Sequence, residues 1–316
     1  MRKIFISLVF LLFAGLQIVF AQMPGALNVG SSPEYIKALT SEWKGERFAD
    51  GRPKVSDSIL ERLKNISIEE AWGALRNKGY QNQFESDWQI INPDEPMTGR
   101  VVTAQYMPLR PDLEKYVKTQ GKIENRAQQG GTNSWPIDVL VDGDVYVADS
   151  YGKIVDGTLI GDNLGNSIYS KSKRGVIFYG SVRDQEGLSE IKGFNGWIKG
   201  QDPSYIQQMS LVSINAPIRI GRAVVLPGDV VLAKKYGVIF IPSHLVEDLV
   251  ITSEVTALRD EFGHLRLREG KYKPGQIDSQ WSDEIKKDFM NWMNNYPGKL
   301  PMTKTELDNY FKDRNW

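Results

Sequence analysis

The sequence GDNL at residues 161–164, followed by GVIFYGSVRD at residues 175–184, decides how the centre of this chain is expected to fold. Residues 163–173 have the pattern of a helix, and residues 176–179 are a short apolar run typical of a buried strand. A helix that leads into such a strand places its N-terminus and the strand's carboxyl end at one edge of a sheet, where open α/β sheets bind ligands. We therefore expect the polar residues of both motifs to meet in one crevice, with residues 180–184 as a loop.

Three charged side chains and two backbone groups of these motifs suit carboxylate chemistry. Free N–H groups at Asn163 and Leu164, beside the guanidinium of Arg183 and the carboxylate of Asp184, can hold an anionic substrate and a hard divalent cation together. Simpler interpretations stay open for each residue taken alone. Arg183 and Asp184 have the pattern of a surface ion pair, and Asp162 has that of a helix cap.

The two motifs resemble the family of regulator of ribonuclease activity A and the 4-hydroxy-4-methyl-2-oxoglutarate (HMG/CHA) aldolases. An aspartate followed by twenty residues and then Arg-Asp is the mark of the aldolase branch, and Asp162 and Arg183-Asp184 have this spacing. Three later segments are similar to the family's later strands: NAPIRIG at 215–221, LPGDVV at 226–231 and GVIFIP at 237–242. The resemblance extends from about Asn65 to Val255.

The resemblance implies the fold and the assembly. We expect an α/β protein with an RraA-like layered α/β/β domain of the swivelling type, in a homotrimer with sites between subunits. The expected division is a signal peptide at 1–21, an N-terminal arm at 22–55, the RraA-like catalytic domain at 56–260 and a helical C-terminal extension at 261–316.

The resemblance also implies the chemistry of the site. The aldolase branch forms a pyruvate enolate with the help of a divalent cation, here Mg²⁺ or Mn²⁺ because the site offers oxygen ligands. By position, Asp184 is the metal ligand, Arg183 binds the substrate's carboxyl or enolate oxygen, and the backbone from Gly161 to Leu164 cradles the substrate carboxylate. Asp162 would act as general base through a water molecule.

Two functions remain in competition. The first is a metal-dependent lyase that converts a 2-oxo or hydroxy carboxylate, such as 4-hydroxy-4-methyl-2-oxoglutarate or oxaloacetate, to pyruvate. The second is a non-catalytic binding or regulatory protein, like the ribonuclease-inhibiting branch. Retention of Asp162, Arg183 and Asp184 favours the first. The family's Ser-Asp-Ala-Leu helix sequence is replaced by AWGAL at 71–75, which indicates a subgroup with its own substrate.

Composition and the N-terminus indicate where the protein works. The chain of 316 residues is 41% hydrophobic, enough for a sizeable core, and it contains no cysteine, which excludes disulfides and thiolate chemistry. Residues 1–21 begin with Arg2-Lys3, continue as an apolar run and end in Val-Phe-Ala, as in a secretory signal. An uncleaved membrane anchor is the alternative. We expect an exported, periplasmic protein with no stable membrane association after leader removal.

Charge indicates the partners. Of 39 basic and 39 acidic residues, removal of Arg2 and Lys3 leaves 37 against 39, a balance of minus two. Nothing in this balance points to nucleic acid, so we expect a small-molecule carboxylate as the ligand. Neither histidine, His244 or His264, has the spacing of a metal pair or a triad, and we expect both to be structural or solvent-facing.

Patterning predicts the remaining elements. Residues 67–70 are a capping box that starts a helix ending near Gly79, and residues 111–129 are a polar, charged insertion. Further strands are expected at 97–104, 144–149, 213–221, 223–226, 229–233 and 238–241, and further helices at 33–43, 56–64 and 242–259. The C-terminal aromatics at helical spacing, from Trp281 to Tyr296, form either a packed arm or a surface for carbohydrate or a partner. A last helix is expected to follow Thr303.

Overall fold

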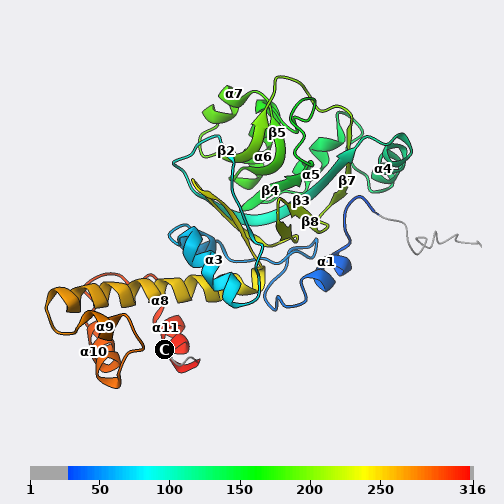
Figure 1. Cartoon of the computed structure of the whole chain (residues 1–316). Coiled ribbons are helices and arrows are strands. Elements are labelled where there is room, and N and C mark those ends of the chain that lie inside the picture. The colour runs from blue at the N-terminus through cyan, green and yellow to red at the C-terminus, as the bar shows by residue number, and fades with distance from the viewer. Residues whose placement is uncertain (1–27, 314–316) are drawn as a thin grey trace, which may run out of the picture.

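The computed structural model describes residues 28–313. The predicted leader, residues 1–21, and the first residues of the predicted arm lie outside the described residues. The chain is a mixed α/β protein whose centre is one twisted sheet (Figure 1). Within residues 28–313, no helix has both the length and the apolar character that a membrane span requires.

The sheet is mixed, with four neighbouring parallel strands at its centre. Its order is β1-β11-β10-β3-β4-β5-β6-β2, and β7 pairs with the second half of β3. Strands β3 to β6 run parallel, whereas β10 pairs antiparallel with β3. The bounds are β1 Phe84–Glu85, β2 Gln89–Ile90, β3 Met97–Pro108, β4 Asp144–Asp149, β5 Val176–Val182, β6 Gly196–Gln201, β7 Met209–Ile214, β10 Val230–Lys234 and β11 Gly237–Ile241.

Helices cover one face of this sheet. The alternation of side chains along β3 and β10 places Val102 and Leu232 on the helix side and Val101 and Val231 on the other. The helices over this face are α2 Asp57–Leu63, α3 Ile68–Asn77, α4 Pro111–Ile123, η1 Thr132–Ser134, α5 Trp135–Asp138, α6 Asp162–Ser172, α7 Gln185–Glu190 and the first half of α8, Ser243–Arg268.

A β-hairpin covers the opposite face. Strands β8 (Ile218–Ile220) and β9 (Ala223–Val225) pair with each other, and the side chains of Ile218, Ile220, Ala223 and Val225 are buried against those of β3, β4 and β10. The order of helices, sheet and hairpin gives the layered α/β/β domain that the motifs implied.

Several predicted elements are confirmed. Strand β4 has the predicted bounds, and α6 begins and ends one residue before the predicted helix. In the capping box of α3, the Ser67 hydroxyl accepts from the Glu70 N–H at 3.1 Å, and the Glu70 carboxylate accepts from the Ser67 N–H at 2.8 Å. These elements were predictable because their hydrogen bonds are local.

Two predictions about strands were wrong. Strand β5 continues to Val182, so residues 180–182 are strand rather than loop. The strand predicted at 213–221 is broken after Ile214, because Asn215 takes a left-handed conformation with φ +55°. For the polar, charged segment at 111–129 no secondary structure was predicted, and it contains helix α4, which buries Val117.

The described part of the arm is attached by a buried ion pair. Helix α1 (Pro33–Leu39) is followed by a loop in which Arg52, only 1% exposed, reaches the first residue of β4. Its guanidinium donates to both Asp144 oxygens, at 2.9 and 3.0 Å. The arm is therefore part of the domain surface.

Helix α8 connects the domain to the C-terminal helices. It runs without a break across residue 260 to Arg268, beyond the predicted end at 259, and its far half lies beside α9 (Pro274–Ile277), α10 (Asp283–Asn294) and α11 (Lys304–Asp313) (Figure 1). Trp281 and Phe289 are buried in a cluster with Phe262 of α8. The aromatic side chains therefore serve mainly as the core of a packed helical extension.

Candidate active site

The site is assembled by a short stretch of parallel pairing that sequence analysis did not identify. Residues 158–160 run beside the last residues of β5: the Leu159 N–H donates to the Ser181 carbonyl at 3.0 Å, and the Arg183 N–H donates to the Ile160 carbonyl at 3.0 Å. Because residue 160 directly precedes Gly161, this pairing carries the start of α6 to the end of β5. The two motifs meet as expected.

Gly161 and Asp184 are in direct contact. A Cβ atom built on Gly161 would collide with Oδ2 of Asp184 and would lie 3.2 Å from Cγ and Nε of Arg183. Only glycine leaves the Asp184 carboxylate its present position. The absence of a side chain at Gly161 therefore allows Arg183 and Asp184 to lie close to the backbone at the start of α6.

Asp184 begins a new element in an unusual conformation. It has φ +55° and ψ +43°, and its carbonyl accepts from the Leu188 N–H at 2.9 Å, so that β5 turns sharply into α7. Aspartate is among the few residues that tolerate the left-handed region. The turn leaves the carboxylate half exposed, at 41% of the side chain, and 3.7 Å from Nη1 of Arg183.

Asp162 occupies the first position of α6 and is held by its neighbours. Its Oδ1 accepts from the Asn163 N–H at 2.7 Å. The prediction of a free Asn163 N–H was therefore wrong. Leu164, whose N–H lies in the same first turn, packs its side chain against the core. Asp162 is the first residue of α6 rather than its N-cap, which is Gly161, but its carboxylate still satisfies one of the first-turn N–H groups.

Two residues of this region were not identified from the sequence. A Cβ on Gly187 would lie 2.9 Å from Cβ of Asp162, so the backbone of α7 packs against that side chain. Oε1 of Gln185, next to Asp184, is buried and has no hydrogen-bond partner within residues 28–313. No motif indicated either residue, because both contacts depend on how α7 folds back on α6.

The histidines do not take part in this arrangement. Nε2 of His244 lies 3.3 Å from the Tyr80 hydroxyl, in a different part of the domain, and burial lowers the pKa of His244. His264 is exposed on α8. Among residues 28–313 there is no group of three or more His, Cys, Asp or Glu side chains arranged to hold a metal ion.

Known proteins share this fold. A family model described as RraA-like, Aldolase/RraA, matches residues 53–240. RraAS2 of Streptomyces coelicolor, described as an unusual member of the RNase ES inhibitor RraA protein family, is 23% identical with a TM-score of 0.56, and the match covers 68% of this chain and 98% of that protein.

Two further solved structures are similar. A protein from Pseudomonas syringae pv. tomato, described as uncharacterized, is 16% identical with a TM-score of 0.57 and is matched over 75% of this chain and 98% of its own. A protein described among novel cellulases from microbes associated with the gut ecosystem is 15% identical with a TM-score of 0.56, over 72% of this chain and 94% of its own. At these identities the likeness shows the fold, and the described roles differ.

Proposed function

Because the chain belongs to the RraA-like family, Aldolase/RraA, we propose that it is a divalent-metal-dependent lyase of the aldolase or decarboxylase type. Its substrate would be a 2-oxo or hydroxy carboxylate such as 4-hydroxy-4-methyl-2-oxoglutarate or oxaloacetate, and its product pyruvate. The observation that carries this proposal is the meeting of Gly161 and Asp162 with Arg183 and Asp184 at one edge of the sheet. The family alone contains both aldolases and ribonuclease inhibitors, so the geometry of the site supplies the argument.

The residues present fit Mg²⁺ or Mn²⁺. Asp184 offers a half-exposed carboxylate, and the lack of a Cβ on Gly161 lets this carboxylate lie against the backbone at the start of α6. Mg²⁺ commonly takes one or two protein carboxylates and completes its shell with water and substrate, so it does not need a cage of three acidic side chains. Bound by Asp184, such an ion would polarise the 2-oxo group and stabilise the negative charge of the enolate.

The chain's own side chains would position the substrate and move the proton. Arg183 presents a planar fork to the substrate carboxylate, and the first turn of α6 offers the Leu164 N–H. With 4-hydroxy-4-methyl-2-oxoglutarate, Asp162 would take the proton from the substrate hydroxyl through one water molecule. As the carbon–carbon bond breaks, this oxygen would become the keto group of one pyruvate, the electron pair of the bond would pass into the 2-oxo half as an enolate, and protonation of the enolate carbon would give a second pyruvate. Oxaloacetate has no such hydroxyl, so there the bond to its C4 carboxylate would break, CO2 would leave, and the enolate would be protonated in the same way.

The exposure of the site supports an oligomer. Arg183 and Asp184 have 44% and 41% of their side chains exposed in the single chain, whereas enolate chemistry benefits from exclusion of water. We propose that a neighbouring subunit covers the site in a homotrimer. With the leader removed, the protein would act outside the cytoplasm on a small carboxylate.

The test is pyruvate release from 4-hydroxy-4-methyl-2-oxoglutarate and from oxaloacetate by the purified protein, with Mg²⁺, with Mn²⁺ and with EDTA. Asp184→Asn is the sharpest variant, because asparagine tolerates φ +55° and removes only the charge. We expect Asp184→Asn to lower Mn²⁺ affinity in a direct binding titration and to lower kcat/KM by at least about a hundredfold, since a removed electrostatic contact costs about 3 kcal/mol. Arg183→Ala should lower turnover and leave Mn²⁺ binding in place.

Asp87→Asn is the matched control, because Asp87 is also an exposed aspartate with positive φ but lies outside the site. Its activity should equal that of the unchanged protein. Full activity of Asp184→Asn would refute the site assignment. Absence of metal-dependent pyruvate release from either substrate would favour the non-catalytic binding protein.

A further inference from the structure

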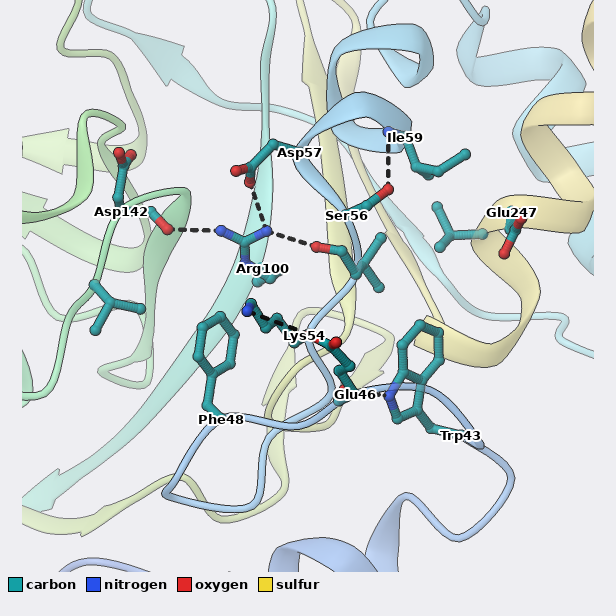
Figure 2. A pocket seen from close by; sticks show the side chains of 13 residues that line it. Trp43, Glu46, Phe48, Lys54, Ser56, Asp57, Ile59, Arg100, Asp142 and Glu247 are labelled. Atoms are coloured by element: carbon teal, nitrogen blue, oxygen red, sulfur yellow. Dashed lines mark hydrogen bonds and ion pairs between the residues drawn. The ribbon is translucent and has the colours of Figure 1, made fainter. Parts of the chain in front are cut away.

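A cavity of about 680 Å³ lies far from the candidate active site. We call it the arm cavity, because the arm forms much of its wall. It is lined by Trp43, Glu46, Phe48, Lys54, Val55, Ser56, Asp57, Ile59, Arg100, Val141, Asp142, Val246 and Glu247 (Figure 2). These residues come from the arm, α2, the start of β3, the loop before β4 and the first turn of α8. Its volume is typical of a small-molecule site.

The arm cavity and the candidate active site are at opposite ends of the parallel strands. Arg100 pairs with Asp144, the first residue of β4, whereas Arg183 and Asp184 follow the last residue of β5. Because β3, β4 and β5 run in the same direction, the arm cavity is at their amino ends and the candidate active site is at their carboxyl ends. The two sites can therefore bind different ligands.

Arg100 forms a fixed part of the wall. Its side chain is 4% exposed, and its Nη1 donates to the Val55 carbonyl at 2.6 Å and to Asp57 at 2.7 Å, while Nη2 donates to the Asp142 carbonyl at 2.6 Å. Figure 2 shows these three contacts radiating from the guanidinium. With both terminal nitrogens engaged, Arg100 has no free fork for a carboxylate or phosphate.

Two carboxylates of the lining have no such partner. Glu247 and Asp142 form no side-chain hydrogen bond or ion pair with any residue of the described chain, whereas Glu46 pairs with Lys54 at 3.4 Å. Lys54, half exposed, keeps donors for another acceptor. The polar lining therefore offers free acceptors together with a donor.

Aromatic rings lie beside these polar groups. In Figure 2, Phe48 and Trp43 flank Lys54 and Glu46 on one side of the cavity, and Glu247 lies on the side of Trp43. Trp43 is held in place because its Nε1–H donates to the Glu46 carbonyl at 2.8 Å. A rigid ring next to a free carboxylate suits a ligand that has both an apolar face and hydroxyl groups.

The charges of the lining select among ligand classes. An anion would be repelled, because the lining carries four carboxylates, those of Glu46, Asp57, Asp142 and Glu247, against the two cationic groups of Lys54 and Arg100. A neutral hydroxylated ring avoids this repulsion, and its hydroxyls can donate to the unpaired carboxylates and accept from Lys54. We propose that the arm cavity binds a neutral saccharide, with its C–H face on Trp43 and its hydroxyls on Glu247 and Lys54.

The experiment measures binding of five neutral sugars to the purified full protein by isothermal titration calorimetry and saturation-transfer NMR. The probes are D-glucose, D-galactose, D-mannose, L-rhamnose and cellobiose, with 1,4-diaminobutane and citrate as cationic and anionic probes. We expect at least one sugar to bind with a Kd on the order of millimolar or tighter. Glu247→Gln, on an exposed helix position, should weaken this binding about tenfold, because a hydrogen bond to a charged acceptor is replaced by one to a neutral one.

Control variants separate this site from other effects. Asp260→Asn, on the exposed part of the same helix, and Asp184→Asn, in the candidate active site, should both leave sugar binding unchanged. Trp43→Ala should abolish binding. The proposal is overturned when none of the five sugars binds, when diaminobutane or citrate binds more tightly than every sugar, or when Glu247→Gln binds as the unchanged protein does.

Discussion

Gly161 and Asp184, twenty-three positions apart in the sequence, lie against each other in the candidate active site. The carboxylate occupies the volume in which any other residue at position 161 would place its Cβ atom. Asp184 itself is held in the left-handed conformation by the turn into α7. The orientation of the proposed metal ligand therefore depends on one absent side-chain atom and one strained backbone position.

Gly161→Ala should impair activity without unfolding the protein. Its φ of −119° is open to alanine, so the expected effect is displacement of Asp184 and Arg183 and a loss of kcat/KM of about a hundredfold. Gly73→Ala is the control, because a Cβ at that partly exposed position in α3 has no neighbour within 4 Å. Pyruvate release and thermal unfolding of both variants check this. An active Gly161→Ala protein would contradict the assigned role of Asp184.

Asp229 is expected to make stability depend on pH in an unusual direction. Its carboxyl is 4% exposed, and burial raises its pKa to about 7 although the N–H groups of Leu226 and Ser243 donate to it. Between about pH 4 and 7 the unfolded chain has lost this proton while the folded chain keeps it, so the contribution of Asp229 to stability falls as pH rises through this range.

Asp229→Asn removes this dependence, because the amide does not titrate. Urea unfolding at pH 4, 5.5 and 7 should show that the stability of the unchanged protein relative to Asp229→Asn decreases toward pH 7, by up to about 4 kcal/mol. The comparison cancels the titration of all other groups. Equal pH profiles of the two proteins would show that folding does not raise the pKa of Asp229.

At the scale of elements, the arm and the sheet are joined by charge rather than by an apolar interface alone. Arg52 also donates from Nε to Asp50 at 2.7 Å, so one guanidinium fixes both the arm's own turn and the start of β4. The pair with Asp144 is almost completely buried, at 1% and 0% exposure. Removing one partner of such a pair leaves the other charge without compensation.

Arg52→Ala should lower the free energy of unfolding by about 3 to 5 kcal/mol, because Asp144 stays buried without its bidentate partner. The matched change is Arg110→Ala, whose pair with Asp112 is exposed on both sides and should contribute less than about 1 kcal/mol. Urea denaturation of the two variants measures the difference. Similar losses in both would mean that the arm is not anchored through Arg52.

At the scale of the whole molecule, Arg62 joins three helices from distant parts of the chain. From α2 it donates to both carboxylate oxygens of Glu254 on α8, at 2.8 and 2.6 Å, and to Glu306 on α11 at 2.7 Å. The extension's aromatic core is separate from the core of the sheet domain. This ion network is therefore a principal connection between the last helix and the domain.

Arg62→Ala should release α11 and leave the sheet folded. Loss of hydrogen bonds to two charged partners is expected to cost about 2 to 3 kcal/mol locally. Hydrogen exchange of the α11 amides should become faster, while exchange in β4 stays unchanged. Lys64→Ala, which removes a more exposed pair with Glu61, is the control and should leave α11 protected. Unchanged α11 exchange in Arg62→Ala would mean that apolar packing alone holds the extension.

The sequence by itself determined the elements whose reasons are local. The capping box of α3 and strand β4 could be predicted, because turn chemistry and short apolar runs act within short segments. The layered fold and the candidate site residues were implied by the resemblance of the GDNL and GVIFYGSVRD motifs to the RraA-like family.

Only the tertiary structure decided how these parts meet. Three contacts join segments that lie apart in the sequence, and no local pattern in either segment predicts them. They are the pairing of residues 158–160 with β5, the contact of Gly187 with Asp162 and the burial of Arg52 on Asp144. The arm cavity likewise exists only because the arm, β3 and α8 come together. Such contacts depend on the packing of the whole chain, since long-range burial overrides what each segment prefers alone.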